Sequence, residues 1–181
     1  MFLVEAYSQI VKISAGKADA FVKAPPAELK VALIYGPDEG LVRERAAALG
    51  VSVVADLTDP FLVCDLTSGD ISSDPARLAD EVAAIALTGG RRLVRVRDAV
   101  DSISKAVQTI LDGAPGDAFT ILQAGQLGPR SALRKLAEFS DDAAAIPCYA
   151  DDAGNLERVI RETLSANDVR ITAEAAGGSS A

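Results

Sequence analysis

Two spacings of apolar residues alternate along the chain. Short apolar runs, typical of buried strands, occur at residues 10–13, 31–35, 61–66, 92–97, 119–122 and 145–149. Apolar positions three or four residues apart, typical of helices, lie between them, at residues 17–23, 41–49, 78–85, 103–111 and 130–139. This alternation predicts an α/β fold in which crossover helices connect the strands of a mostly parallel sheet.

Turn-forming residues set the expected ends of the third of these helices. Asp74 and Pro75 are typical of an N-cap and first turn, and Gly89 and Gly90 are typical of a helix end. Three apolar residues at helical spacing are expected to face the core: Leu78, Val82 and Ile85.

Leu87 does not belong to this apolar face. At about 100° per residue it falls roughly opposite the core-facing positions. Two interpretations stay open. A solvent-facing leucine fixed by a glycine stop has the geometry of an anchor for a partner protein. Alternatively, the last turn unwinds and Leu87 packs under the sheet, which the spacing alone favours.

The turn after the strand at 31–35 has the layout of a phosphate-binding loop without its phosphate-binding residues. Gly36 and Gly40 bracket this turn, with three residues between them rather than four. Two aliphatic residues follow Gly40, where the functional motif has Lys and then Ser or Thr. Asp38 is placed to cap the next helix, and with Glu39 it puts two carboxylates where a triphosphate would sit. The loop is therefore not expected to bind nucleotide, and we expect no cofactor.

Composition excludes several classes of function. The net charge of -8 and pI near 4.6 argue against a dedicated nucleic-acid binder. The chain has no histidine, which excludes Ser-His-Asp triads and most mixed Cys/His zinc sites. Cys64 and Cys148 each stand in an apolar run and are expected to be buried thiols.

Two groups of basic residues are candidates for a DNA contact. They are the arginines within 91–97, and Arg130, Arg134 and Lys135 on one helix. In so acidic a chain, pairing of the first group with Asp98 or Asp101 is the more ordinary interpretation. The second group equally fits a solvated helix face.

No catalytic group of residues, metal site, signal peptide or membrane-spanning run is recognisable, so a cytoplasmic protein is expected. One domain is the default for 181 residues, with a candidate boundary at Asp151–Gly154. Beyond it, residues 155–164 and 172–176 are expected to be helical, and a Gly/Ser tail follows.

Five motifs follow one another along the chain: Ile34–Arg45, Asp74–Glu81, Gly89–Arg92, Pro129–Leu136 and Ile146–Asp152. Together they resemble the amino-terminal half of the bacterial DNA polymerase III delta subunit, a clamp-loader subunit. The similarity runs from about residue 11 to about residue 171. The combination is far more specific than any one of the motifs.

The resemblance implies a RecA-like first domain of the AAA+ type, a three-layer sandwich with a degenerate P-loop, at residues 11–152. Residues 153–181 would be the start of a helical lid domain and a flexible tail, with the collar domain absent, and residues 1–10 an unmatched leader. The family binds the sliding clamp, the beta subunit, and helps to open it for loading onto DNA. It has no catalytic residues of its own, although it is part of the DNA polymerase III holoenzyme, a DNA-directed DNA polymerase and nucleotidyltransferase.

The implied clamp contact falls on Ala86, Leu87 and Thr88, where family members usually have Leu followed by Phe. Thr88 replaces the aromatic, so clamp binding is either weaker here or carried by neighbouring side chains. The other implied partners are the remaining clamp-loader subunits, with DNA contacted only indirectly and no membrane. The alternative function is enzymatic: the chain would be a divergent P-loop NTPase or kinase with an atypical phosphate loop.

Overall fold

A computed structural model of the chain describes residues 13, 15–87 and 89–149. The chain divides into two units, Met1–Tyr149 and Ala150–Ala181, and the described residues all belong to the first. Thr88, the helices expected at 155–164 and 172–176, and most of the strand expected at 10–13 lie outside the described residues. The expected domain boundaries therefore stay predictions.

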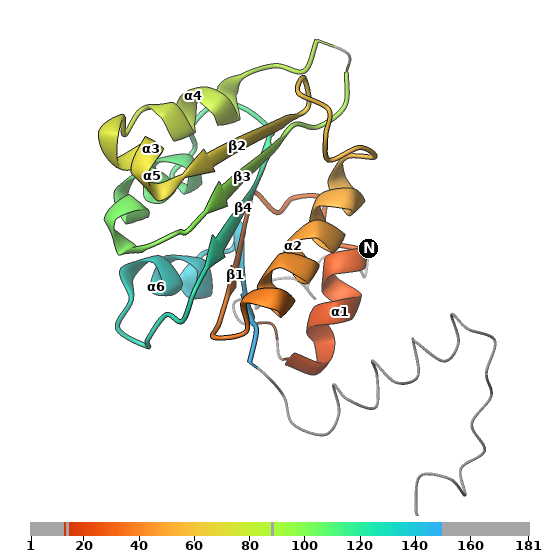
Figure 1. Ribbon diagram of the computed structural model, residues 1–181. Helices are drawn as coiled ribbons and strands as arrows, with labels where there is room; N and C mark the ends of the chain where they lie inside the picture. Colours follow the sequence, from red (N-terminus) through yellow and green to blue (C-terminus); the bar gives the residue numbers. More distant parts are fainter. Residues whose placement is uncertain (1–12, 14, 88, 150–181) are drawn as a thin grey trace, which may run out of the picture. The chain divides into compact units, whose positions relative to one another are not determined.

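Among the described residues, five parallel strands form one sheet with the order β2-β3-β4-β1-β5 (Figure 1). The strands are β1 Val31–Tyr35, β2 Val63–Thr67, β3 Leu93–Arg97, β4 Phe119–Ala124 and β5 Ala143–Pro147. β1 lies between β4 and β5, and Val31 aligns with Thr120 of β4 on one side and with Ala143 of β5 on the other. Every residue of β1 and β5 is buried, which explains why these strands read as continuous apolar runs. The predicted α/β fold with a parallel sheet is confirmed.

Helices cover both faces of the sheet and make three layers (Figure 1). On one face, α1 Ala15–Lys23 and α2 Glu39–Val53 pack with buried residues such as Ile34 and Ile121. The other face carries α3 Ser68–Ser73, α4 Arg77–Ala83, the short 3₁₀ helix Asp101–Ile103, α5 Ser104–Leu111 and α6 Ala132–Phe139. In the part of the chain that is described, no helix is both long and apolar enough to cross a membrane.

The expected bounds of α4 are wrong at both ends. Asp74 does not cap it, because the N-cap is Ala76, and the Asp74 carboxylate instead accepts a turn hydrogen bond from the Ala76 amide at 3.2 Å. The helix ends at Ala83 rather than at Gly89, and Ile85 is 86% exposed instead of facing the core.

The early end of α4 is explained by a contact with Arg92, eleven residues after its acceptor Glu81. The Arg92 guanidinium donates to the Glu81 carbonyl oxygen at 2.7 Å and to the Glu81 carboxylate at 3.2 Å. This carbonyl is the one that the Ile85 amide would use in a longer helix. The last bond of the helix is therefore that from the Ala84 amide to the Asp80 carbonyl, at 3.0 Å.

The sequence reasoning missed α3 altogether. The Thr67 hydroxyl accepts from the Asp70 amide at 3.2 Å, and the Asp70 carboxylate accepts from the Thr67 amide at 2.8 Å, which is a reciprocal capping box. The six-residue helix buries Ile71. The Thr-x-x-Asp spacing was the only signal in the sequence, because six residues are too few to show a helical period.

Candidate functional site

The loop that follows β1 lies at the carboxyl edge of the sheet, and its main-chain amides are engaged by carbonyl oxygens of the protein. The Gly36 amide donates to the Gly125 carbonyl at 3.2 Å, and the Asp38 amide to the Cys148 carbonyl at 3.4 Å. A side chain at Gly36 would overlap the Cys148 carbonyl. The segment after β5 therefore lies directly against this loop.

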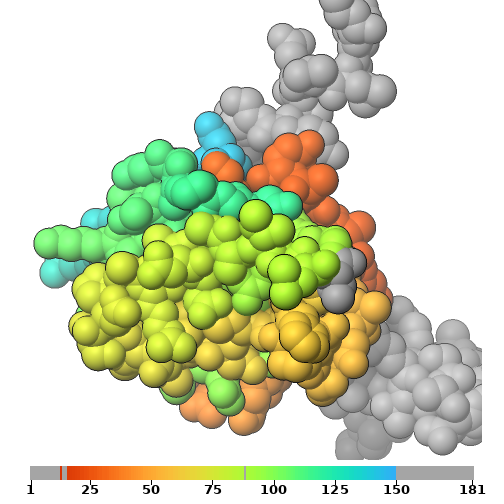
Figure 2. Space-filling view, turned by 90° about the horizontal axis from the view of Figure 1, so that it is seen from above, coloured from red at the N-terminus to blue at the C-terminus, as the bar shows by residue number. Residues whose placement is uncertain are grey.

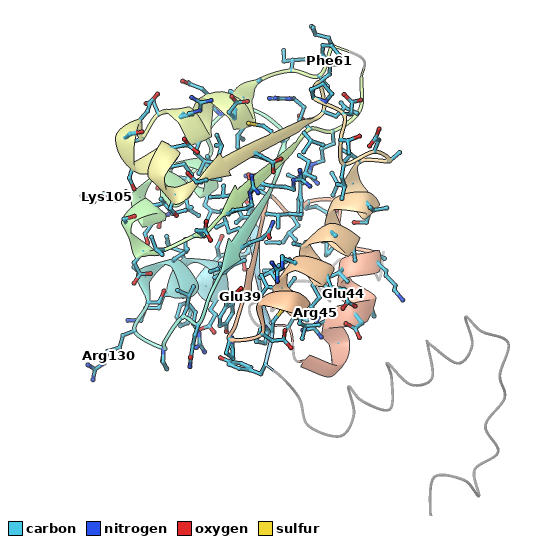
Figure 3. The ribbon with its side chains drawn as sticks, in the orientation of Figure 1. Glu39, Glu44, Arg45, Phe61, Lys105 and Arg130 are labelled. Carbon is cyan, nitrogen blue, oxygen red and sulfur yellow. The ribbon has the colours of Figure 1, made fainter. Side chains whose placement is uncertain are left out.

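The expected role of Asp38 is confirmed. Its carboxylate accepts from the Leu41 amide at 2.9 Å and caps α2. Glu39 is the first residue of α2, follows Asp38 directly and is exposed (Figure 3). Two acidic side chains thus stand at the helix start, where the helix dipole would otherwise favour an anion.

Arg45 is the last residue of the motif Ile34–Arg45 and holds the segment after β5 in place. Its side chain is 8% exposed and donates to the Pro147 carbonyl at 2.9 Å, and it forms an ion pair with Asp19 of α1 at 3.2 Å. It also lies 3.6 Å from the Cys148 sulfur. The guanidinium therefore joins α2, α1 and the end of β5.

The segment between α4 and β3, residues 84–92, lies at the opposite, amino edge of the sheet (Figure 1). Leu87 is 89% exposed, so the interpretation that it packs under the sheet is wrong. The other part of that interpretation, that the last helical turn unwinds, is correct, because α4 ends at Ala83, four residues before Leu87. Ala86 is half-buried, and its carbonyl accepts from the Gly89 amide at 3.2 Å. We call residues 84–90 the tip loop.

Arg91 fixes the carboxyl end of the tip loop. Its guanidinium donates to the carbonyl oxygens of Asp117 at 2.6 Å, Ala27 at 3.2 Å and Leu29 at 2.5 Å. It also lies 5.1 Å from the centre of the Phe119 ring, within cation–π distance. Arg92 reaches back to Glu81 as described above, so both ends of the loop are tied to the domain.

The basic groups considered as DNA contacts are largely engaged within the protein. Arg95 pairs with Asp65 at 2.6 Å, so the ion pairing expected for the first group is correct in kind. The expected partners are wrong, because the observed acids are Glu81 and Asp65 rather than Asp98 and Asp101. Arg97 is exposed at the end of β3.

The second basic group lies on and just before α6. Arg134 pairs with Glu138 at 2.8 Å and lies 5.2 Å from the centre of the Tyr35 ring. Burial raises the pKa of Tyr35 to about 12. Arg130 and Lys135 are exposed, and Figure 3 shows Arg130 extending away from the body of the domain.

The two cysteines differ in burial. Cys148 is buried, as expected, and burial raises the pKa of its thiol. Cys64 is only half-buried, and desolvation raises its thiol pKa to about 11. No group of three or more residues suited to hold a metal ion occurs among residues 13, 15–87 and 89–149.

Two solved structures with a similar fold are a DNA polymerase III gamma-subunit-related protein of Thermotoga maritima and the DNA clamp loader delta protein of Bacillus subtilis. The first is 15% identical, with a TM-score of 0.54, over 81% of this chain and 49% of its own. The second is 16% identical, with a TM-score of 0.64, over 90% of this chain and 50% of its own.

The chain thus spans about half the length of these two structures. No family model and no curated protein matches it. At this identity the similarity shows the fold alone, and it agrees with the α/β fold with a parallel sheet that the sequence predicts.

Proposed function

We propose that this chain contains the clamp-binding domain of a clamp-loader delta subunit and that it binds the sliding clamp through the tip loop. The observation that carries the proposal is that Leu87 is 89% exposed on a loop whose ends are held by the hydrogen bonds of Arg92 and Arg91. The fold shared with the Bacillus subtilis clamp loader delta protein supports it. A large aliphatic side chain on a fixed loop suits insertion into an apolar pocket.

In this role the protein is a binding module without catalysis of its own. Its partners are the sliding clamp and the other clamp-loader subunits, and it works in the cytoplasm beside DNA polymerase III. A module that binds the opened clamp more tightly than the closed clamp shifts the ring towards opening by that difference in affinity. Ala86 and Thr88 flank the anchor, and the degenerate phosphate loop serves only as scaffold.

The test is binding of the full chain to the immobilised cognate clamp, with wild type compared with Leu87→Ser. We expect Leu87→Ser to weaken binding at least tenfold, since a buried leucine is worth about 1.5–3 kcal/mol. Val100→Ser is the matched control, because Val100 is also exposed but follows β3, at the carboxyl edge of the sheet. Equal affinity of wild type and Leu87→Ser would remove the site assignment.

A further inference from the structure

Besides Ile85 and Leu87, a further large apolar side chain is exposed at the amino edge of the sheet. Phe61, just before β2, is 62% exposed. An exposed aromatic ring is expensive to leave in water and is enriched at the centre of binding surfaces. Phe61 does not belong to the resemblance motifs, and nothing described above gives it a role in the core.

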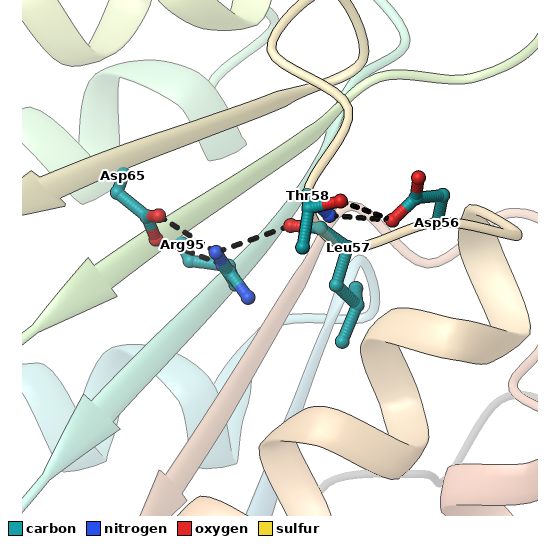
Figure 4. Close-up of polar contacts among 5 residues, drawn as sticks. All are labelled: Asp56, Leu57, Thr58, Asp65 and Arg95. Carbon is teal, nitrogen blue, oxygen red and sulfur yellow. Dashed lines mark hydrogen bonds and ion pairs between the residues drawn. The ribbon is translucent and has the colours of Figure 1, made fainter.

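The loop that carries Phe61 is held by side-chain hydrogen bonds. The Asp59 carboxylate accepts from the Phe61 amide at 2.8 Å, and the Asp56 carboxylate accepts from the amide and hydroxyl of Thr58 at 2.8 and 2.7 Å. Arg95 donates to the Leu57 carbonyl at 3.5 Å while pairing with Asp65 (Figure 4). The ring is therefore presented on a loop that needs little ordering before it binds.

The Phe61 loop lies beside the tip loop. β2 and β3 are neighbours, with Val63 aligned with Leu93, and the Leu93 amide donates to the Leu62 carbonyl at 2.8 Å. Adjacent strands lie about 4.8 Å apart, so the segments that enter them start side by side. Figure 3 shows Phe61 at this edge, and Figure 2, which looks down on it, shows the two segments next to each other.

We propose that Phe61 forms one apolar binding surface with Ile85 and Leu87 and contacts the same partner, the sliding clamp. This inference rests on the proposed function and extends its site to a second loop. The surface has an acidic border, because Asp56 is exposed and hydrogen bonds from Thr58 lower its pKa. The complementary surface on the clamp is therefore an apolar pocket bordered by basic or neutral groups.

The experiment measures binding of the full chain to the immobilised cognate clamp for wild type, Phe61→Ser, Leu87→Ser and the double variant. Phe139→Ser is the matched control, since Phe139 is 79% exposed but lies at the end of α6, just before β5, and three strands separate β5 from β2 in the sheet. Circular dichroism checks that each variant is folded. We expect Phe61→Ser to weaken binding about tenfold and Phe139→Ser to change it less than twofold. A further variant, Phe61→Tyr, keeps the aromatic ring and should bind like wild type.

The double variant tests whether the two side chains share one pocket. We expect its loss to be smaller than the product of the two single losses, because contacts in one pocket are coupled. Loss of binding in Leu87→Ser with full binding in Phe61→Ser would overturn the inference and leave the proposed function standing. Equal losses in Phe61→Ser and Phe139→Ser would also overturn it. No binding by wild type would overturn both.

Discussion

At Gly36 two backbones come so close that no side chain fits between them. A Cβ atom there would meet the carbonyl of Cys148, whose amide donates to the Tyr35 carbonyl at 2.7 Å. The same position carries the first glycine of the phosphate-loop pattern. Its identity is therefore explained by the packing of the segment after β5, whether or not a phosphate ever binds.

We expect Gly36→Ala to lower the free energy of unfolding by more than about 2 kcal/mol, because the methyl group must displace a backbone carbonyl. Gly125→Ala is the control, since a Cβ at Gly125 would meet nothing within 4 Å. Urea denaturation followed by circular dichroism measures both. Equal stabilities of the two variants would show that the Gly36 site relaxes freely.

The raised thiol pKa values predict slow alkylation. Only the thiolate reacts, so the iodoacetamide rate of Cys64, with a pKa of about 11, should rise about tenfold per pH unit between pH 7 and pH 10. Buried Cys148 should react more slowly still. Mass spectrometry of the alkylated peptides checks this. Fast labelling of Cys148 at pH 7 would contradict its burial.

At the scale of elements, the start of α2 depends on one carboxylate. Asp38→Ala removes the cap on the Leu41 amide and should cost about 1 kcal/mol of stability, whereas Asp38→Asn keeps an acceptor oxygen and should cost less than half of that. Thermal unfolding of the two variants separates capping from charge. Similar losses in both would mean that the negative charge, rather than the hydrogen bond, stabilises the helix end.

Local signals were enough to predict elements buried on all sides. β1 has the predicted bounds, β5 lies two residues before the predicted run at 145–149, and the Asp38 cap lies three residues from the amide that it binds. The end of α4 was not predictable in this way, because it depends on Arg92, eleven residues away from its acceptor Glu81. Helical spacing placed Ile85 in the core, but no helix continues to carry it there.

The same limit applied to the candidate site. Spacing set Leu87 apart from the core face, yet only the structure decided that the side chain is exposed. Phe61 was counted with the strand that follows it, and β2 begins two residues later. The Asp59-Pro60 pair before it is a turn signal and was the available hint. The hydrogen bonds of Arg91 join segments far apart in the sequence, so no pattern of neighbouring residues could predict them.

For the molecule as a whole, the phosphate-type loop and the proposed clamp-binding surface lie at opposite edges of one sheet. We expect Mg²⁺ and ATP together, at millimolar concentration, to leave the unfolding temperature unchanged. A ligand at a hundred times its dissociation constant would add about 2.7 kcal/mol of stability. Differential scanning fluorimetry measures the shift. A clear rise that Gly40→Val abolishes would instead favour the NTPase or kinase alternative.

The acidic chain and the apolar binding surface together predict weak salt dependence. We expect the affinity for the clamp to change less than about tenfold between 50 and 200 mM NaCl. Binding through phosphate contacts would fall by about 10³–10⁵ over the same range. Titration calorimetry at the two salt concentrations checks this. A steep fall would indicate that the exposed Arg97, Arg130 or Lys135 contributes to binding.

The strand order also determines when the sheet can close during synthesis. Of the described strands β1 is translated first, yet its two neighbours in the sheet are β4 and β5, which are the last of the described strands to be made. Until residue 147 has left the exit tunnel, β1 has only one of its two hydrogen-bonding neighbours. Pairing over such separations is slow. The nascent chain therefore exposes this apolar strand until the strands on both of its sides have been made, and we expect co-translational chaperones to matter more for this domain than for a helical one of equal length.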